Sequence, residues 1–218
     1  YSYAFYLIGK YDYGVDHHTL RNIIARWFFA TALTSRYSSS SETVMEQDLN
    51  RLRDVKDAAG FIQLLNHIID SLLTEDFWNI TLPNELETSS SNTPSLYAYY
   101  ASLVLLKAPV LFSNLSVADL LNPATKAKKS ALERHHLFPR AYLEKLGITE
   151  VRDTNQIANF ALVEWSDNNE ISDTAPAEYF PAYQNRYNEK EWETMRFFHA
   201  LPKGWELLPY ADFLEQRR

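Results

Sequence analysis

Residues 133–147, ERHHLFPRAYLEKLG, and residues 159–176, NFALVEWSDNNEISDTAP, are the two halves of the stretch that decides the fold. In the first half, the adjacent histidines His135 and His136 end a short run that can form a strand. Pro139 follows three residues after the second histidine, and proline cannot continue a strand ladder because it lacks a backbone N–H group. We therefore expect the strand to end abruptly beside the histidines.

The second half predicts another strand and a short helix. Asn159 opens the apolar segment FALV, which is typical of a buried strand. The segment leads into a polar turn that carries Asp167, Asn168 and Asn169. Together the two halves predict two strands and a short helix that bring histidines and amides to one place.

The rest of the chain has a helical pattern. Apolar residues recur at helical spacing, and helices are expected over residues 18–34, 57–73, 96–108, 177–186, 189–200 and 208–217. Asp16 is a possible cap for the first of these helices. Residues 96–108, LYAYYASLVLLKA, are apolar nearly all round and predict a buried central helix. His199 is expected at the surface or in the last turn of its helix. The fold class is α+β and predominantly helical, with a strand–strand–helix element embedded in a helical domain.

Three regions are expected along the chain: a helical region at 1–125, the motif at 126–180, and C-terminal helices at 181–218 that pack on the core. The chain opens with YSYAFYLIGKY and not with Met. Because this apolar and aromatic run is already in progress at its first residue, we interpret residues 1–125 as the continuation of a longer protein.

Composition excludes several classes of protein. A chain of 218 residues with 46% hydrophobic residues can bury a sizeable core. Its five glycines form no GxGxxG or GxxxxGK[ST] pattern, and its lack of cysteine excludes disulfides and thiolate zinc sites. No apolar run reaches the roughly 18 residues of a membrane span, so no membrane partner is expected. The absence of cysteine fits a cytoplasmic location, which is our expectation.

Charge is distributed unevenly along the sequence. The net charge of −7 counts against a nucleic-acid partner, because phosphate contacts need lysine and arginine. Basic residues nevertheless cluster around the histidine pair, and the candidates for phosphate contact are Lys126, Lys128, Lys129, Arg134 and Arg140. The alternatives are a solvated linker for the lysines and a surface salt bridge for Arg140. We expect a protein whose surface is mainly acidic, with a basic patch around the histidine pair.

The phrases HHLFPRAYL and NFALVEWSDNNEISDTAPAEY resemble the ββα-metal (His-Me finger, HNH) nuclease motif. More narrowly, they are similar to the C-terminal nuclease domain of GmrSD-type modification-dependent restriction enzymes, whose relatives in phage defence include BrxU-like and phosphorothioate-sensing systems. RWFFATALTSRYSSSSETVMEQDL near the start and LPKGWELLPYADFLEQRR at the end extend the resemblance. The resemblance implies a metal-dependent DNA endonuclease, the effector part of an anti-phage restriction protein whose N-terminal sensor domain is absent from this chain.

Roles for individual residues also follow from the resemblance. It implies that His136 is the general base, that His135 and Asn168 hold one divalent metal ion, Mg²⁺ or Mn²⁺, and that Asn159 holds the histidine-bearing loop through backbone hydrogen bonds. Two neighbours are second candidates for the metal ligand: Asp167 and Asn169. An imidazole and an amide bring no negative charge, so Mg²⁺ should bind weakly until a phosphate is present, and softer divalent ions should bind better.

One geometric condition and two alternatives remain. Consecutive residues of a regular strand face opposite sides, so His135 and His136 can share a site only if the strand ends or bulges there. A non-catalytic helical DNA-docking or interaction domain with a degenerate ββα element is the first alternative to a DNA endonuclease. An RNase with the same site is the second.

Overall fold

A computed structural model describes residues 1–90, 92–122 and 132–218 and divides them into two compact units, Tyr1–Asn84 and Glu85–Arg218. Lys126, Lys128 and Lys129 lie outside the described residues. The division differs from the expected boundary at residue 125, because the helices that follow Glu85 pack with the motif. Within the described ranges, no helix is both long and apolar enough to span a membrane.

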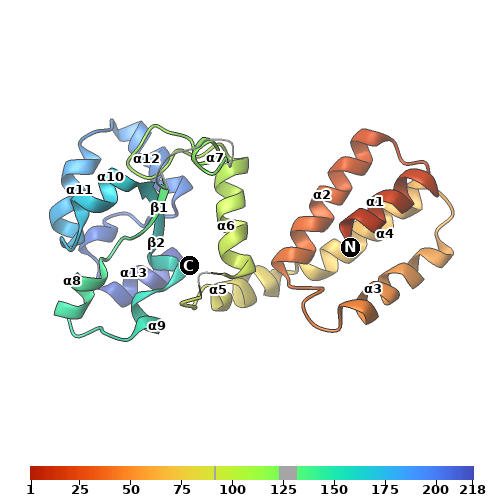
Figure 1. The fold of residues 1–218 in the computed structure, drawn as a ribbon, viewed down its shortest axis with the longest axis horizontal. Coiled ribbons are helices and arrows are strands. Elements are labelled where there is room, and N and C mark those ends of the chain that lie inside the picture. The colour runs from red at the N-terminus through yellow and green to blue at the C-terminus, as the bar shows by residue number, and fades with distance from the viewer. Residues whose placement is uncertain (91, 123–131) are drawn as a thin grey trace. The chain divides into compact units, whose positions relative to one another are not determined.

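The first unit is helical. Its helices are α1 (Ser2–Tyr11), α2 (His17–Leu33), α3 (Ser41–Asn50) and α4 (Ala58–Leu72), with short turns η1 (Arg51–Asp54) and η2 (Phe77–Thr81) and with α5 (Leu82–Glu85) at its end (Figure 1). Asp16 caps α2 as predicted, since its side chain accepts a hydrogen bond from the Thr19 N–H group at 3.0 Å. Phe5, Trp27 and Phe61 are fully buried and form the centre of this unit.

The second unit carries a two-stranded antiparallel sheet among helices. Its elements are α6 (Pro94–Leu105), α7 (Val117–Leu120), β1 (Leu132–His136), α8 (Arg140–Lys145), α9 (Val151–Thr154), η3 (Ile157–Asn159), β2 (Phe160–Glu164), α10 (Trp165–Ile171), α11 (Pro176–Gln184), α12 (Glu189–Phe198), η4 (Trp205–Leu207) and α13 (Tyr210–Arg217). The predicted class, α+β with helices dominant, is confirmed, and so is the strand–strand–helix order β1, β2, α10.

The two faces of β2 pack against different helices, as Figure 1 shows for α6 and α11. Ala161 and Val163 lie in one cluster with residues of α11, and Leu162 lies in another with residues of α6. This alternation is the period of two expected for a strand that is buried on both faces. A segment before the motif also pairs with β2, because the Leu111 N–H group donates to the Leu162 carbonyl at 3.0 Å. That pairing explains why residues 85–122 belong to the unit that contains the motif.

One expectation about buried residues was wrong, and another was met in part. The helix α6 is not buried all round, since Tyr97 is 56% exposed and Leu105 is 70% exposed. His199 was expected at the surface or in the last turn of its helix; it is the C-cap residue of α12, and it is fully buried. Its Nε2 atom lies 2.9 Å from the Pro109 carbonyl oxygen, and burial lowers its pKa to about 4.

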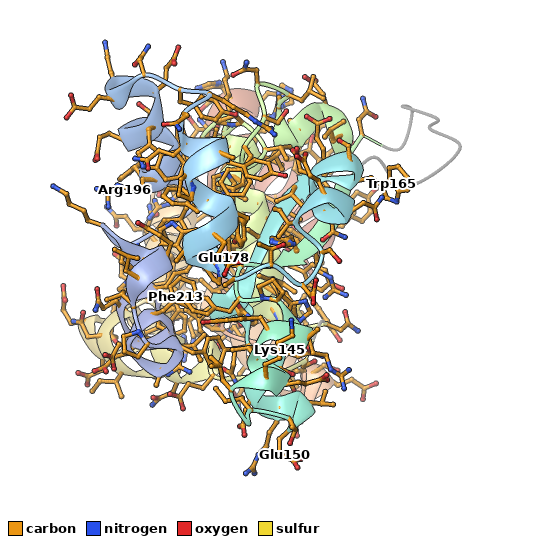
Figure 2. All side chains as sticks on the ribbon, turned by 90° about the vertical axis from the view of Figure 1, so that its left-hand side faces the viewer. Lys145, Glu150, Trp165, Glu178, Arg196 and Phe213 are labelled. Atoms are coloured by element: carbon orange, nitrogen blue, oxygen red, sulfur yellow. The ribbon has the colours of Figure 1, made fainter. Side chains whose placement is uncertain are left out.

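An aromatic cluster supports the motif from the C-terminal side. Trp205 is fully buried, with ring centroids of Phe138, Phe180 and Phe213 between 5.3 and 6.1 Å from its own. Figure 2 shows Phe213 among the packed side chains of this unit and Lys145 on the outside. Because Phe138 follows the histidine pair, this cluster fixes the chain just beyond the strand end.

Replacing Trp205 with alanine should lower the free energy of unfolding by about 3–5 kcal/mol, because a large cavity would open in a packed core. Leu207→Ala is the matched control. Leu207 lies in the same turn but is 74% exposed, so its loss should change stability by less than about 0.5 kcal/mol. Urea unfolding followed by tryptophan fluorescence and circular dichroism measures both, and equal losses would mean that Trp205 does not anchor the core.

Candidate active site

The strand β1 ends at His136 and contains no bulge. The register runs unbroken through His135, which pairs with Ala161, and His136, which pairs with Phe160. The Leu137 N–H group donates to the Asn159 carbonyl at 2.9 Å, and the next helix, α8, begins directly after Pro139. The abrupt strand end is confirmed, and the two imidazoles emerge on opposite faces of that end.

Asn159 joins the two halves of the motif through its side chain. Its Oδ1 atom accepts from the Phe138 N–H group at 2.8 Å, and its Nδ2 atom donates to the carbonyls of Phe138 at 3.0 Å and Thr154 at 3.1 Å. Asn159 is fully buried. These are backbone hydrogen bonds of the kind that was expected to hold the histidine-bearing loop.

His135 faces α10 and α11. Its Nδ1 atom lies 2.9 Å from Oδ1 of Asn168, and its ring stands edge-on to that of Tyr179 with centroids 6.0 Å apart. The residue is 3% exposed, and its Nε2 atom is buried without a hydrogen-bond partner among the described residues. Burial lowers the pKa of His135 to about 4, so the ring is neutral at pH 7 and has a lone pair available to a metal.

His136 lies on the other face and is half-buried. Its Nε2 atom lies 2.8 Å from Oδ1 of Asn155, and its ring meets that of Phe160 edge-on at 4.8 Å. The guanidinium of Arg134 lies 5.4 Å from the centre of the same Phe160 ring. Burial, and then the positive charges of Arg134 and Arg140, lower the pKa of His136, while the hydrogen bond to Asn155 opposes them.

Asp167 and Asn169, the two alternatives to Asn168 as a metal ligand, have other surroundings than His135. Asp167 is buried and accepts a hydrogen bond from Nη1 of Arg186 at 3.2 Å, and burial raises the pKa of its carboxyl. Asn169, one residue beyond Asn168, is exposed. Of the three candidate ligands on α10, Asn168 is therefore the one that meets the buried histidine.

The described basic residues near the pair are both exposed, and they differ in their partners. Arg134 lies over the Phe160 ring, as described above. Arg140 forms a salt bridge with Glu144 through its Nε atom at 2.9 Å, which is the surface pair considered as its alternative role. An exposed i,i+4 pair is weak, so Arg140 can exchange Glu144 for a phosphate at little cost.

The donor atoms of His135 and Asn168 fit one divalent ion. Adjacent ligands of an octahedral ion with bonds of about 2.1 Å lie about 3 Å apart. The Nδ1–Oδ1 separation of 2.9 Å matches that spacing. In the hydrogen bond to the amide oxygen Nδ1 carries the ring proton, so both atoms would face one ion only after that proton had moved to Nε2. In the part of the chain that the structure describes, no three His, Cys, Asp or Glu side chains converge on a metal site. The protein thus offers two neutral donors, and further ligands would have to come from water or substrate.

Sequence reasoning did not single out Asn155. It lies in the spacer between the two halves of the motif, at the end of α9, and contacts His136 only through the fold. The spacer has no periodicity or motif that predicts this contact. Only the register between β1 and β2, together with the position of α9, brings the two side chains together.

Asn159→Ala should lower the free energy of unfolding by about 2–4 kcal/mol, because the Phe138 N–H and carbonyl groups would stay buried without partners and the Thr154 carbonyl would keep only its 3.3 Å contact with Tyr210. Asn169→Ala is the matched control, since this asparagine is exposed on α10. Urea denaturation should show a loss for the first variant alone. Equal stability of both variants would contradict the role assigned to Asn159.

Comparisons with known proteins do not place the chain in a family. No protein-family model matches it, and no solved structure matches it. The chain is similar to an uncharacterized protein of Methanocaldococcus jannaschii, with 24% identity over 159 residues, which is 72% of this chain. The aligned part spans 24% of the length of that relative.

Proposed function

We propose that the chain is a metal-dependent DNA endonuclease with a ββα-metal site, and that it acts as the effector part of a modification-sensing anti-phage restriction protein. The observation that carries the proposal is the environment of the histidine pair. One neutral, buried imidazole meets an amide oxygen on α10, and a second, half-buried imidazole lies at the adjacent strand end. The restriction context and the sensor domain rest on the sequence resemblance alone.

His136 is the proposed general base. Hydrolysis of a phosphodiester requires a group that takes a proton from water at neutral pH. The lowered pKa of His136 keeps its imidazole unprotonated at pH 7, and its half-buried position leaves it open to water. His135 is buried and has no such access, so it is unsuited to the same task.

His135 and Asn168 would hold the divalent ion. When bound, such an ion would balance the charge of the phosphate and stabilise the leaving oxygen. Both protein donors are neutral, so Mg²⁺ should bind weakly in the absence of DNA, and Mn²⁺ should bind better through the imidazole. Arg134 and Arg140 are exposed near His136 and would contact phosphates without reading base sequence.

A non-catalytic docking domain is the second candidate function. The observation in its favour is that His135 and Asn168 satisfy each other by a hydrogen bond, while no carboxylate joins them among the described residues. A docking domain needs no divalent ion. Metal-dependent cleavage by the chain therefore separates the two candidates.

Supercoiled plasmid incubated with Mn²⁺ or Mg²⁺ should be nicked or cut by the wild-type chain and not by His136→Ala. Loss of a general base should slow cleavage by about 10²–10⁴-fold. Excess Mn²⁺ should partly rescue His135→Ala, because a lost ligand weakens metal binding, and should not rescue His136→Ala. His67→Ala, which changes an exposed histidine of α4, is the matched control and should cleave normally. Rescue of His136→Ala by metal, with His135→Ala dead, would mean that the two roles are reversed.

Asn168→Ala should weaken Mn²⁺ binding by at least about tenfold, whereas Asn169→Ala should leave it unchanged. The reason is that Asn168 meets His135 and Asn169 faces solvent. Isothermal titration calorimetry in the presence of a short DNA duplex measures both affinities. Equal losses would show that the ligand was assigned to the wrong asparagine.

A further inference from the structure

The segment between the two halves of the motif is fixed by hydrogen bonds to its backbone. Tyr210 of α13 donates its hydroxyl to the Asp153 carbonyl at 2.8 Å and lies 3.3 Å from the Thr154 carbonyl oxygen. The side chain of Asn159 donates to the same Thr154 carbonyl at 3.1 Å. Thr154 is fully buried, and the next residue, Asn155, ends α9 with its N–H group bonded to the Val151 carbonyl at 2.9 Å. The peptide group between Thr154 and Asn155 is thus held at both its carbonyl and its N–H.

The side chain of Asn155, which extends from this fixed backbone, contacts His136. Its Oδ1 atom lies 2.8 Å from Nε2 of the imidazole. An amide oxygen can accept a hydrogen bond but cannot donate one, so Nε2 carries the proton of the neutral ring. The remaining nitrogen, Nδ1, then has a free lone pair. His136 as a whole is half-buried, so solvent reaches part of the residue.

Two contacts set the orientation of the His136 ring. The edge-on contact with Phe160 limits how far the imidazole can swing toward β2. The hydrogen bond to Asn155 fixes its rotation, because an inverted ring would lose its partner. Neither contact involves Asn168, so the ring of His136 is oriented independently of the proposed metal ligands.

We propose that Asn155 is a positioning residue for the proposed nuclease reaction: it holds His136 with the proton on Nε2 and presents Nδ1 as the atom that accepts the proton of the attacking water. The inference rests on the proposed function for its catalytic part. Asn155 itself touches neither water nor phosphate in this scheme. It acts through His136, and α13 supports it through Tyr210.

Two substitutions separate positioning from packing. Asn155→Leu keeps the branched shape and the number of heavy atoms of the side chain and removes the acceptor, whereas Asn155→Asp keeps an acceptor oxygen at the same place. We expect kcat to fall by about 10–100-fold in Asn155→Leu, since slight misplacement of a catalytic group costs rates of that order. KM should stay within about twofold, because ground-state binding of DNA is untouched. Asn155→Asp should restore most of kcat.

Nuclear magnetic resonance gives a readout that does not depend on activity. With ¹⁵N-labelled histidine at pH 8, the wild-type chain and Asn155→Asp should show the His136 proton on Nε2. Asn155→Leu should show a mixture of the two tautomers. Asn185→Ala, which changes an exposed asparagine at the end of α11, is the matched control and should leave both the tautomer and kcat as they are in the wild type.

The outcomes distinguish the inference from the proposed function. If the wild-type chain cleaves DNA and Asn155→Leu keeps the wild-type kcat or a single tautomer, the inference is overturned and the proposed function stands. If Asn155→Asp fails to restore kcat although its thermal unfolding matches the wild type, the loss reflects packing and the inference is also overturned. A wild-type chain that cleaves with neither Mn²⁺ nor Mg²⁺ overturns the proposed function, and with it the catalytic role of Asn155.

Discussion

The hydrogen bonds of one buried amide, that of Asn159, are the constraint on which the motif depends. They tie the backbone beyond the histidines to the start of β2 and to the end of α9. An amide can do this because it carries a donor and an acceptor in one plane, which neither a carboxylate nor an apolar side chain offers. Since Phe138 is held at both its N–H and its carbonyl group, β1 must end where it does.

The strand end gives two adjacent histidines different environments. Because β1 is regular up to His136, the rings lie on opposite faces. His135 faces the helices α10 and α11 and is almost completely buried, whereas His136 faces the end of α9 and is half-buried. Burial is the main reason that the pKa of His135 is lowered, and protonation of the neighbouring His136 would lower it further. A ligand and a base with different requirements can therefore come from neighbouring positions.

Local patterns in the sequence predicted what depends on local structure. Apolar periodicity predicted α2, α4, α6, α11, α12 and α13, and the paired strands followed from the short runs that end at His136 and begin after Asn159. Features that depend on non-local contacts were missed or mistaken: the partner of His136 at Asn155, the burial of His199 against Pro109, and the pairing of Leu111 with β2 that moves the unit boundary. No spacing rule encodes which distant backbone atom a side chain meets, because the packing of several elements decides it.

The two proposed metal-binding side chains are electrically neutral. On the proposed function, this neutrality would determine when a metal ion binds. The carboxylate closest in sequence to the proposed metal donors, Asp167, is turned to Arg186, and His135 and Asn168 carry no charge at pH 7. A divalent ion held only by such donors has an uncompensated charge, so it gains most from an anionic partner. On the proposed function, DNA phosphate would be that partner, and metal and DNA would each strengthen binding of the other by the same factor. The chain would then bind metal mainly where DNA is already present, so that cleavage would require both together.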